Sequence, residues 1–305
     1  MKTSSIEMID EMGDFIGFAS DVKLIYSGEF TIKVATTEEN VIDNYLSSDD
    51  VINVYISGID SRGGINEVSR SDVNIIMSIN KKTHNILMIN TPRDYYVPLS
   101  ISNGVRDKLT HAGVYGIECS RNTLEMLYGI QIDYYVKVNF SGFEKIIDSL
   151  GGVDVTLDYS ATLSQAGNLT VHNGVNHFNG EQALAFARER YAYLDGDRQR
   201  GRNQMMIMEA AIKKACSPAI ISNYTSVLSE VSKNVITDMS YDFIADLAQT
   251  QLNDMAAWNI TQISVTGVGS YSSTTYSMPE WSLYIMVPDE ESVENAREQI
   301  RDNYN

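Results

Sequence analysis

Basic residues are scarce in this 305-residue sequence: 23 lysines and arginines stand against 40 aspartates and glutamates, for a formal net charge of −17. Affinity for a nucleic-acid backbone comes from neutralisation of its phosphates by lysine and arginine. The chain is therefore not expected to bind nucleic acid, and any anion that it binds must be held by a local cluster of positive charge.

Long apolar runs and cysteine clusters are also missing. No stretch approaches the about 18 consecutive apolar residues of a membrane span, and the N-terminal MKTSSIEMIDEMGDF lacks the basic start and apolar core of a signal peptide. The sequence as given is expected to be soluble, which is also consistent with an excised ectodomain. Cys119 and Cys216 are too few for a disulfide scaffold, and a bridge between them and two buried free thiols both stay open.

Several catalytic motifs are absent as well. The sequence contains no GxxxxGK[ST], HExxH, CxxC or GxSxG, so it gives no support for a nucleoside-triphosphate cradle, a zinc protease or a serine-hydrolase elbow. His172 and His177 flank a proposed turn and are interpreted as surface residues rather than metal ligands.

What is present divides into two parts. Residues 1–48 read as an accessory segment and linker, with a helix-like stretch at 6–22, a strand-like stretch at 29–35 and an acidic polar stretch from 36 onward. Residues 49–305 read as one domain in which apolar, β-branched runs alternate with helical patterns. The predicted fold is α/β, with a central mixed β-sheet sandwiched between α-helices.

The pattern predicts individual elements within this domain. Strands are expected at 51–59, 73–79, 85–90, 132–140, 260–268 and 281–287, and helices at 119–129, 141–152, 202–215 and 289–303. A turn or hairpin is expected around Asn173-Gly174, followed by a helix that Asn179 caps and that ends near residue 188.

The first candidate cluster is GIDSRGGINEVSRSD. Asp60 follows a predicted strand directly, and Arg70 and Asp72 immediately precede the next one. If these strands are neighbours, both carboxylates lie at the same end of the sheet, where ligands commonly bind in open α/β folds. Two carboxylates could share a hard cation such as Mg²⁺. A surface loop with aspartate–arginine pairs is the alternative, and spacing alone leaves both open.

The second cluster is NTPRDYYVP, directly after the third predicted strand. Pro92 stiffens the exit of that strand and so fixes the direction of Arg93. Arg93 could bind a ligand or pair with Asp94 or another acid.

The third cluster, ARERYAYLDGDRQRGRNQ, contains five arginines within fifteen positions. In an extended segment Arg188 and Arg190 share a face, whereas on a helix they would diverge by about 200°. Arg200 is expected near the N-terminus of the long helix, with Gln204 one turn along the same face. Helix N-termini suit phosphate, and arginine grips phosphate in a bidentate fork.

Repulsion sets a condition on this cluster. Two like charges about 6 Å apart repel by roughly 3 kcal/mol at an effective dielectric of 20, so converging arginines need an anion or compensating acids. Glu189, Asp195 and Asp197 are available as compensating acids. A salt-bridge network and an anion site are therefore both open on physical grounds.

Together the clusters resemble the LytR-CpsA-Psr family of Gram-positive cell envelopes. The similarity runs from about residue 52 to 288, through YISGIDSRGGINEVSRSDVNIIMSIN, INTPRDYYV, KLTHAGVYG, YYVKVNFSGFEKIIDSLGGVDV, HFNGEQALAFARERY, GDRQRGRNQ and YSMPEWSLYIMVPD. The motifs occur in the family's order, which makes the resemblance specific.

The resemblance implies a phosphotransferase that moves a phosphate-linked glycopolymer, such as teichoic acid or capsule, from a polyprenyl-pyrophosphate carrier to peptidoglycan. It implies that the enzyme acts at the extracellular face of the cell membrane, with an N-terminal transmembrane anchor outside this chain. It also implies Mg²⁺, with Mn²⁺ as the alternative cation, bound by Asp60 and Asp72. Asp72 is the candidate base, and the family's pyrophosphate-binding positions fall on Arg70, Arg93, Lys108, Arg188, Arg190, Arg200 and Gln204.

Two alternative functions and one assignment of residues to the surface accompany this hypothesis. A Mg²⁺-dependent hydrolase of the same polyprenyl pyrophosphate would use the same residues, with water in place of the sugar hydroxyl. A non-catalytic module that binds polyprenyl phosphate is the alternative outside the enzymes. Arg198 and Arg202 are not clearly part of the family's set and are assigned to the surface.

Overall fold

The computed structural model describes residues 6–9, 15–19, 46, 48–60, 64–164, 168–193, 196–221 and 224–305. The chain divides into two compact units, residues 1–45 and residues 46–305.

In the first unit, β1 (Ile6–Ile9) pairs antiparallel with β2 (Phe15–Ala19). The helix predicted over 6–22 is therefore wrong where the structure describes it. Runs of four or five apolar residues do not separate helix from strand by periodicity, and the aromatic and β-branched residues of β2 favour a strand. The strand predicted at 29–35 lies outside the described residues.

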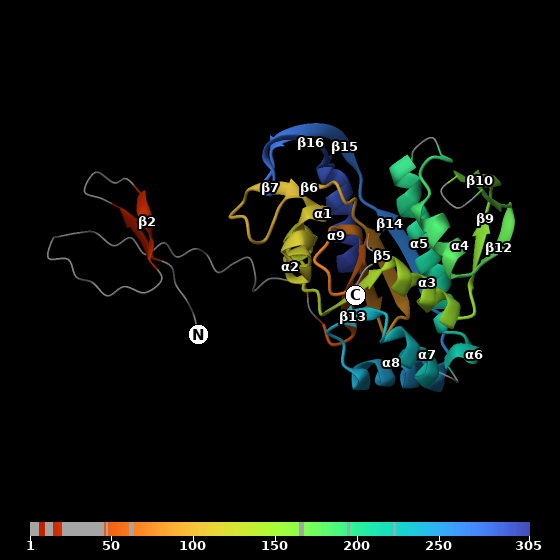
Figure 1. Ribbon diagram of the computed structural model, residues 1–305. Coiled ribbons are helices and arrows are strands. Elements are labelled where there is room, and N and C mark those ends of the chain that lie inside the picture. The colour runs from red at the N-terminus through yellow and green to blue at the C-terminus, as the bar shows by residue number, and fades with distance from the viewer. Residues whose placement is uncertain are drawn as a thin grey trace. The chain divides into compact units, whose positions relative to one another are not determined.

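A mixed sheet forms the centre of the second unit (Figure 1). Within the described residues its strand order is β13-β8-β3-β4-β5-β14. The strands β3, β4 and β5 are successive antiparallel neighbours, whereas β8 runs parallel to β3 and β14 runs parallel to β5. Their bounds are β3 Val51–Ile59, β4 Ser71–Asn80, β5 Asn85–Asn90, β8 Tyr134–Asn139, β13 Val235–Thr237 and β14 Asn259–Ser264. The α/β prediction with a central mixed sheet is confirmed.

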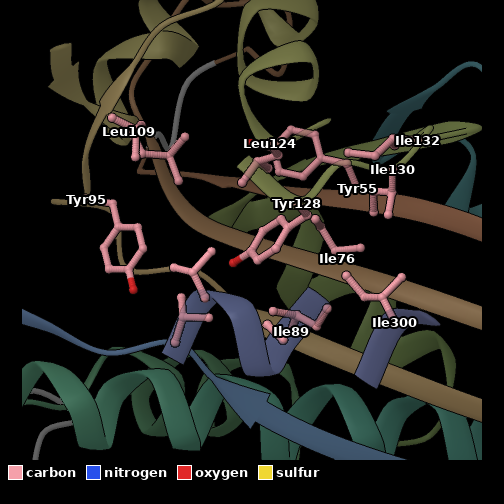
Figure 2. Close-up of a cluster of buried hydrophobic side chains, with 14 of the residues drawn as sticks. Tyr55, Ile76, Ile89, Tyr95, Leu109, Leu124, Tyr128, Ile130, Ile132 and Ile300 are labelled. Atoms are coloured by element: carbon pink, nitrogen blue, oxygen red, sulfur yellow. The ribbon is translucent and has the colours of Figure 1, made fainter. Parts of the chain in front are cut away.

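One face of this sheet is closed by α2 (Ile117–Tyr128) and α9 (Glu290–Asn303). Figure 2 shows the contact, in which Tyr55 and Ile76 from the strands meet Leu124 from α2 and Ile300 from α9. We call this cluster the closed core. Gly129 ends α2 in the left-handed region, with φ 67°, as its position after the helical pattern predicts.

The opposite face of the sheet packs against α5 (Gly196–Ala215) and α8 (Tyr241–Asp254). Beside α5, a smaller layer brings together α3 (Phe140–Ser149), α4 (Gly180–Arg188) and β9 (Val153–Leu157) around its own apolar cluster. The sheet is therefore covered by helices on both faces, as predicted (Figure 1).

The chain bends at Asn173, but the predicted hairpin is wrong. β11 (Leu169–Val171) pairs with β10 (Ala161–Leu163), whereas β12 (Gly174–Phe178) pairs with β9. β11 and β12 thus do not pair with each other across the bend, and each pairs instead with a strand that comes earlier in the chain. The Asn179 cap is confirmed, because its side chain and Gln182 form a capping box at the start of α4.

The remaining elements complete the second unit. β15 pairs with β16 in an antiparallel hairpin, and β6 pairs with β7. Their bounds, with those of the short helices, are β6 Tyr96–Pro98, β7 Arg106–Lys108, α1 Leu109–Ala112, η1 Gly113–Tyr115, α6 Pro218–Ile221, α7 Tyr224–Val231, β15 Gly267–Thr274 and β16 Pro279–Pro288.

Two expectations about the whole chain can now be addressed. Cys119 and Cys216 are both free thiols, and burial raises the pKa of each. Among the described residues, no helix combines the length and the apolar character that a membrane crossing requires.

Candidate functional site

Two aspartates meet at one end of the β3–β4 pair. Asp60 directly follows β3, and Asp72 is the second residue of β4. Because Ile59 pairs with Ser71 across the two antiparallel strands, both carboxylates lie at the same edge of the sheet. The neighbour relation on which the first cluster depends is confirmed.

Arg93 reaches this edge from the segment after β5. Its Nη1 donates to Asp72 Oδ1 over 2.9 Å, and its Nε lies 3.6 Å from Asp94 Oδ2. Thr110 Oγ1 also donates to Asp72 Oδ1, over 3.2 Å. Lys108 forms an ion pair with the other oxygen of Asp94. Four charged side chains thus alternate in sign from Asp72 to Lys108.

Arg188 and Arg190 flank the end of α4. The helix stops at Arg188 because Glu189 adopts an extended conformation, with φ −64° and ψ 132°. The predicted helix end near residue 188 is confirmed, but the predicted extended segment begins only at Glu189, because Arg188 is still helical. Arg188 and Arg190 nevertheless line the same cavity. The Arg188 guanidinium lies 4.3 Å above the centre of the Phe140 ring, a cation–π contact that holds its stem in place.

Glu189 is fully buried and determines the shape of this segment. Its Oε1 accepts hydrogen bonds from the backbone N–H groups of Arg190, Tyr191 and Ala192, over 2.9, 2.7 and 3.1 Å. A buried carboxylate is stabilised when several backbone donors surround it. In these bonds Glu189 serves as an anchor for the backbone. Asp195 and the side chain of Asp197, the other acids considered, lie outside the described residues.

Arg200 and Gln204 come from α5, which starts at Gly196, several residues earlier than the predicted 202. Asn203, fully buried, donates to the carbonyl of Phe186 over 3.0 Å, and Gln204 donates to the carbonyl of Ala187 over 3.4 Å. These bonds reach carbonyls in the last turn of α4, where the Phe186 carbonyl also accepts a hydrogen bond from the Glu189 N–H over 3.4 Å. They also tie Arg200 to the segment that carries Arg188 and Arg190.

Gly201 lets α5 approach the sheet. A Cβ at this position would lie 2.5 Å from Asn90 Nδ2, closer than side-chain carbons approach such atoms. Arg200, one residue earlier, is therefore brought near the start of β4 and the end of β5, and it is itself 8% exposed.

These side chains surround a cavity of about 330 Å³, which we call the arginine cavity. Most of its wall is apolar and comes from strands β3, β4 and β8 and helices α3, α4 and α5. Its charged and polar wall contains seven of the nine predicted site residues: Asp60, Asp72, Arg93, Arg188, Arg190, Arg200 and Gln204.

The two other predicted residues lie elsewhere. Arg70 is exposed and does not line the arginine cavity, and Lys108 is separated from it by Asp94 and Arg93. Arg198 and Arg202 are exposed, which confirms their assignment to the surface. His172 and His177 are exposed as predicted, and His177 pairs with Asp154.

Sequence reasoning missed three residues that organise the site: Thr110, Glu189 as a backbone anchor, and Asn203. The signal for Glu189 was its place between two arginines at a helix end, where a buried acid can hold the N–H groups that follow. Thr110 and Asn203 act on partners 38 and 17 residues away, and their identities alone gave no signal.

The arrangement also fits a hard cation. Within the described residues, no group of three or more histidine, cysteine, aspartate or glutamate side chains could hold a metal ion. Mg²⁺, however, is commonly held by one or two carboxylates with waters and substrate phosphates completing the shell. Asp60 and Asp72 line the same cavity. The two described hydrogen bonds to Asp72 both use Oδ1, so the pair has the chemistry for such partial ligation.

The chain is similar in sequence to proteins of known name. Polyisoprenyl-teichoic acid--peptidoglycan teichoic acid transferase TagU of Bacillus cereus is 34% identical over 197 residues, which span 63% of this chain and 62% of the relative. The corresponding TagT of Bacillus subtilis is 33% identical over 220 residues, 68% of this chain and 67% of the relative. The chain thus spans about 62% of the length of the first of these relatives.

Solved structures agree with the fold. The crystal structure of Bacillus subtilis TagV matches with a TM-score of 0.70 at 27% identity, covering 84% of this chain and 98% of TagV. TagT bound to LI-WTA matches with a TM-score of 0.67 at 26% identity, covering 84% of this chain and 91% of TagT. The sequence profile of the LytR_cpsA_psr family matches residues 23–295. The chain belongs to the LytR-CpsA-Psr family.

Proposed function

We propose that this protein transfers a phosphate-linked glycopolymer from a polyprenyl-pyrophosphate carrier to peptidoglycan. The observation that carries the proposal is the arginine cavity, in which four arginines line the polar wall of a mostly apolar space. A polyprenyl pyrophosphate has the matching chemistry, with an anionic head and an apolar tail. The names of the relatives, which are transferases of polyisoprenyl-linked teichoic acid to peptidoglycan, support the same substrate pair.

The apolar wall suits a prenyl chain. It includes Ile56, Ile75, Phe143, Leu184 and Met208. Burial of apolar surface contributes about 25 cal/mol per Å², so even a few prenyl units give several kcal/mol of binding free energy. The lipid tail would thereby keep the carrier in place while its head group reacts.

The charged wall suits a pyrophosphate. Arg93, Arg188, Arg190 and Arg200 converge on one cavity, and like charges about 6 Å apart repel by roughly 3 kcal/mol at an effective dielectric of 20. An anionic ligand relieves that repulsion, and each charge-assisted hydrogen bond adds about 1.5–3 kcal/mol. Two carboxylates, Asp60 and Asp72, line the cavity beside the four arginines.

The reaction follows from this placement. A hydroxyl oxygen of the acceptor sugar forms a bond to the phosphorus that carries the glycan, and the bond from that phosphorus to the lipid phosphate breaks. Polyprenyl monophosphate leaves, and Asp72 is the candidate acceptor of the hydroxyl proton. The arginines stabilise charge on the phosphoryl oxygens and orient them, which is most of what phosphoryl transfer requires of a protein.

A cation is part of the proposal. Asp60 and Asp72 would hold Mg²⁺ or Mn²⁺, which would supply further neutralisation of phosphate charge. The proposed site of action is the outer face of the cell membrane, where the lipid carrier and peptidoglycan meet. The predicted N-terminal membrane anchor belongs to this proposal.

The test is a reaction of the purified protein with a polyprenyl-pyrophosphate-linked oligosaccharide, Mg²⁺ and uncross-linked peptidoglycan. We expect a covalent glycan–peptidoglycan product by mass spectrometry, and its loss on treatment with EDTA. Release of polyprenyl phosphate without a conjugate would instead identify a hydrolase. Retention of the lipid with no turnover would identify a non-catalytic binding module.

A further inference from the structure

A second cavity, of about 400 Å³, adjoins the arginine cavity. The two share one wall, formed by Asp72, Arg93, Arg200 and Gln204. Beyond this shared wall their surroundings differ. The arginine cavity continues under α3 and α4, whereas the second cavity continues along the ends of β5 and β14 to the base of the β15–β16 hairpin.

The lining of the second cavity combines polar groups with apolar side chains, among them Met205, Met206 and Ile263. Hydroxyl and amide side chains come from the end of β5 and from β14 and the residues after it, among them Asn90, Gln262 and Ser264. Arg198 and Arg202 add positive charge on the α5 side. Amide and hydroxyl groups recognise sugar hydroxyls, and arginine recognises carboxylates. These polar and charged groups fit a hydroxyl-rich ligand that carries acidic groups.

The stereochemistry of the proposed reaction separates the two ligands. Attacking and leaving oxygens lie roughly in line at a phosphorus undergoing transfer. The leaving lipid phosphate stays with its tail on the arginine-cavity side. The attacking hydroxyl must then approach from the opposite side of the phosphorus, across the shared wall. The donor glycan, bound to the same phosphorus, projects sideways to this line.

We propose that the second cavity binds the saccharide of the peptidoglycan acceptor, with Arg198 and Arg202 receiving carboxylates of its peptide stem. This inference rests on the proposed function and adds the place from which the nucleophile arrives. Arg93 and Arg200 then face donor phosphate on one side and the acceptor hydroxyl on the other. Arg198 and Arg202 would then bind the acceptor, whereas the arginines of the arginine cavity bind the pyrophosphate.

The shape of the cavity is supported by packing. Gly201 and Asn90 are in close approach where α5 meets β5, and Asn90 is only 8% exposed. β14 pairs in register with β5, so that Ser264 lies beside Asn90 at the end of the parallel pair. Ser264 is exposed, so a larger side chain can replace it without entering the protein core.

The test uses binding, which does not require turnover. Ser264→Tyr fills the second cavity, and Thr261→Tyr is the matched control, because Thr261 is an exposed residue of the same strand that lines neither cavity. The probe is a soluble, uncross-linked peptidoglycan oligomer, titrated calorimetrically into wild type and variants. Retention of the polyprenyl-pyrophosphate donor is measured in parallel by mass spectrometry of solvent extracts.

We expect Ser264→Tyr to weaken oligomer binding about tenfold or more, the equivalent of about 1.4 kcal/mol, with donor retention and the Thr261→Tyr control unchanged. Arg198→Gln combined with Arg202→Gln should weaken binding of the oligomer, and less so of an oligomer with amidated carboxylates. Equal binding by Ser264→Tyr and Thr261→Tyr overturns the inference, as does no binding by wild type. A parallel fall in donor retention also overturns it, because the cavity would then hold the donor glycan.

These outcomes are distinct from failure of the proposed function. If wild type binds the oligomer through the second cavity but forms no conjugate, the acceptor site stands and the transferase activity does not. If a conjugate forms and Ser264→Tyr makes it at the wild-type rate and oligomer concentration, the transferase stands and the acceptor site does not.

Discussion

The two faces of the central sheet carry the same kind of apolar side chain, but one face is packed into a closed core and the other borders a cavity. On one face, Tyr55 and Ile76 are fully buried against α2 and α9 (Figure 2). On the other, Ile56 and Ile75 are also buried, yet both line the arginine cavity. β-branched residues alternate along the same strands, so the difference arises from what covers each face rather than from the strands themselves.

Several polar side chains on the closed face form hydrogen bonds to protein partners. Tyr55 donates to Asn74 Oδ1 over 2.7 Å, and Asn53 donates to the hydroxyl of Tyr304 over 2.6 Å. Asn303 of α9 reaches Ser78 in the same way. On the open face, charged side chains collect at the end of the strands around a space that the protein does not fill. The sheet therefore separates the closed core from the cavity that we propose as the substrate site.

The sharpest test of this division uses adjacent residues of β4. Ile76→Ala should lower the free energy of unfolding by about 2–5 kcal/mol, because it creates a cavity in the closed core. Ile75→Ala should cost less, at the lower end of that range, because its surroundings are already open on one side. Chemical denaturation measures both losses. Lipid retention should fall for Ile75→Ala alone, and equal losses of stability with equal retention would contradict the division.

A second comparison uses two arginines that are matched in charge. Arg190→Ala should lower transfer activity about 100-fold, or about 2.7 kcal/mol, as expected when one donor to a reacting anion is lost. Its melting temperature should stay near that of wild type, because relief of repulsion among the arginines offsets lost contacts. A steady-state rate assay and a thermal melt measure the two effects.

Arg297 provides the control for this pair. On the closed face it donates through Nε and Nη2 to the carbonyl of Leu127, over 3.0 and 2.6 Å, at the end of α2. Arg297→Ala should therefore lower stability by about 1 kcal/mol and leave the rate unchanged. A large drop in melting temperature for Arg190→Ala would favour a structural salt-bridge role for the arginine cluster.

The smallest expected effect concerns acid stability. Burial alone would raise the pKa of Asp107, but hydrogen bonds from His111, from the hydroxyl and N–H of Ser277 and from the N–H of Lys108 outweigh it and lower the pKa. A lowered folded-state pKa stabilises the protein above the unfolded value of about 3.9 and is lost as pH falls through the folded value. Wild type should therefore lose stability below about pH 4.

Substitution separates this contribution from general acid unfolding. Asp107→Asn should flatten the decrease in melting temperature below about pH 4, measured by thermal melts at a series of pH values. Asp154→Asn is the control, because Asp154 pairs with His177 over 2.7 Å but both side chains are exposed, and exposed pairs contribute little. Identical pH profiles for wild type and Asp107→Asn would contradict the prediction.

The fold could be predicted to a large extent because its main elements have strong local patterns. The apolar runs of β3, β4 and β5 and the capping signals at Asn179 and Gly129 identified strands and helix ends correctly. The errors fell where local patterns were short, as in β1 and β2, or where pairing partners were distant, as for β11 and β12. Helix α8 was not predicted from the sequence.

The candidate site divides in a similar way. Charged residues next to strand and helix ends could be picked out by position, and seven of them line one cavity. Residues that act across the fold could not. Thr110 meets Asp72 only because β7 and α1 return beside β4, and Asn203 meets the Phe186 carbonyl only because α5 packs on α4. The second cavity likewise depends on how β14 and the β15–β16 hairpin meet α5.

The hydrogen bonds of Asn203 and Gln204 have a consequence for affinity. Because they hold the carbonyls at the end of α4, the segment with Arg188 and Arg190 and the helix with Arg200 form one preorganised unit. A ligand that bridges separate loops must offset the entropy lost when each loop becomes ordered. Here that ordering is completed during folding, so for the proposed pyrophosphate ligand more of the attraction to arginine would be available as binding free energy.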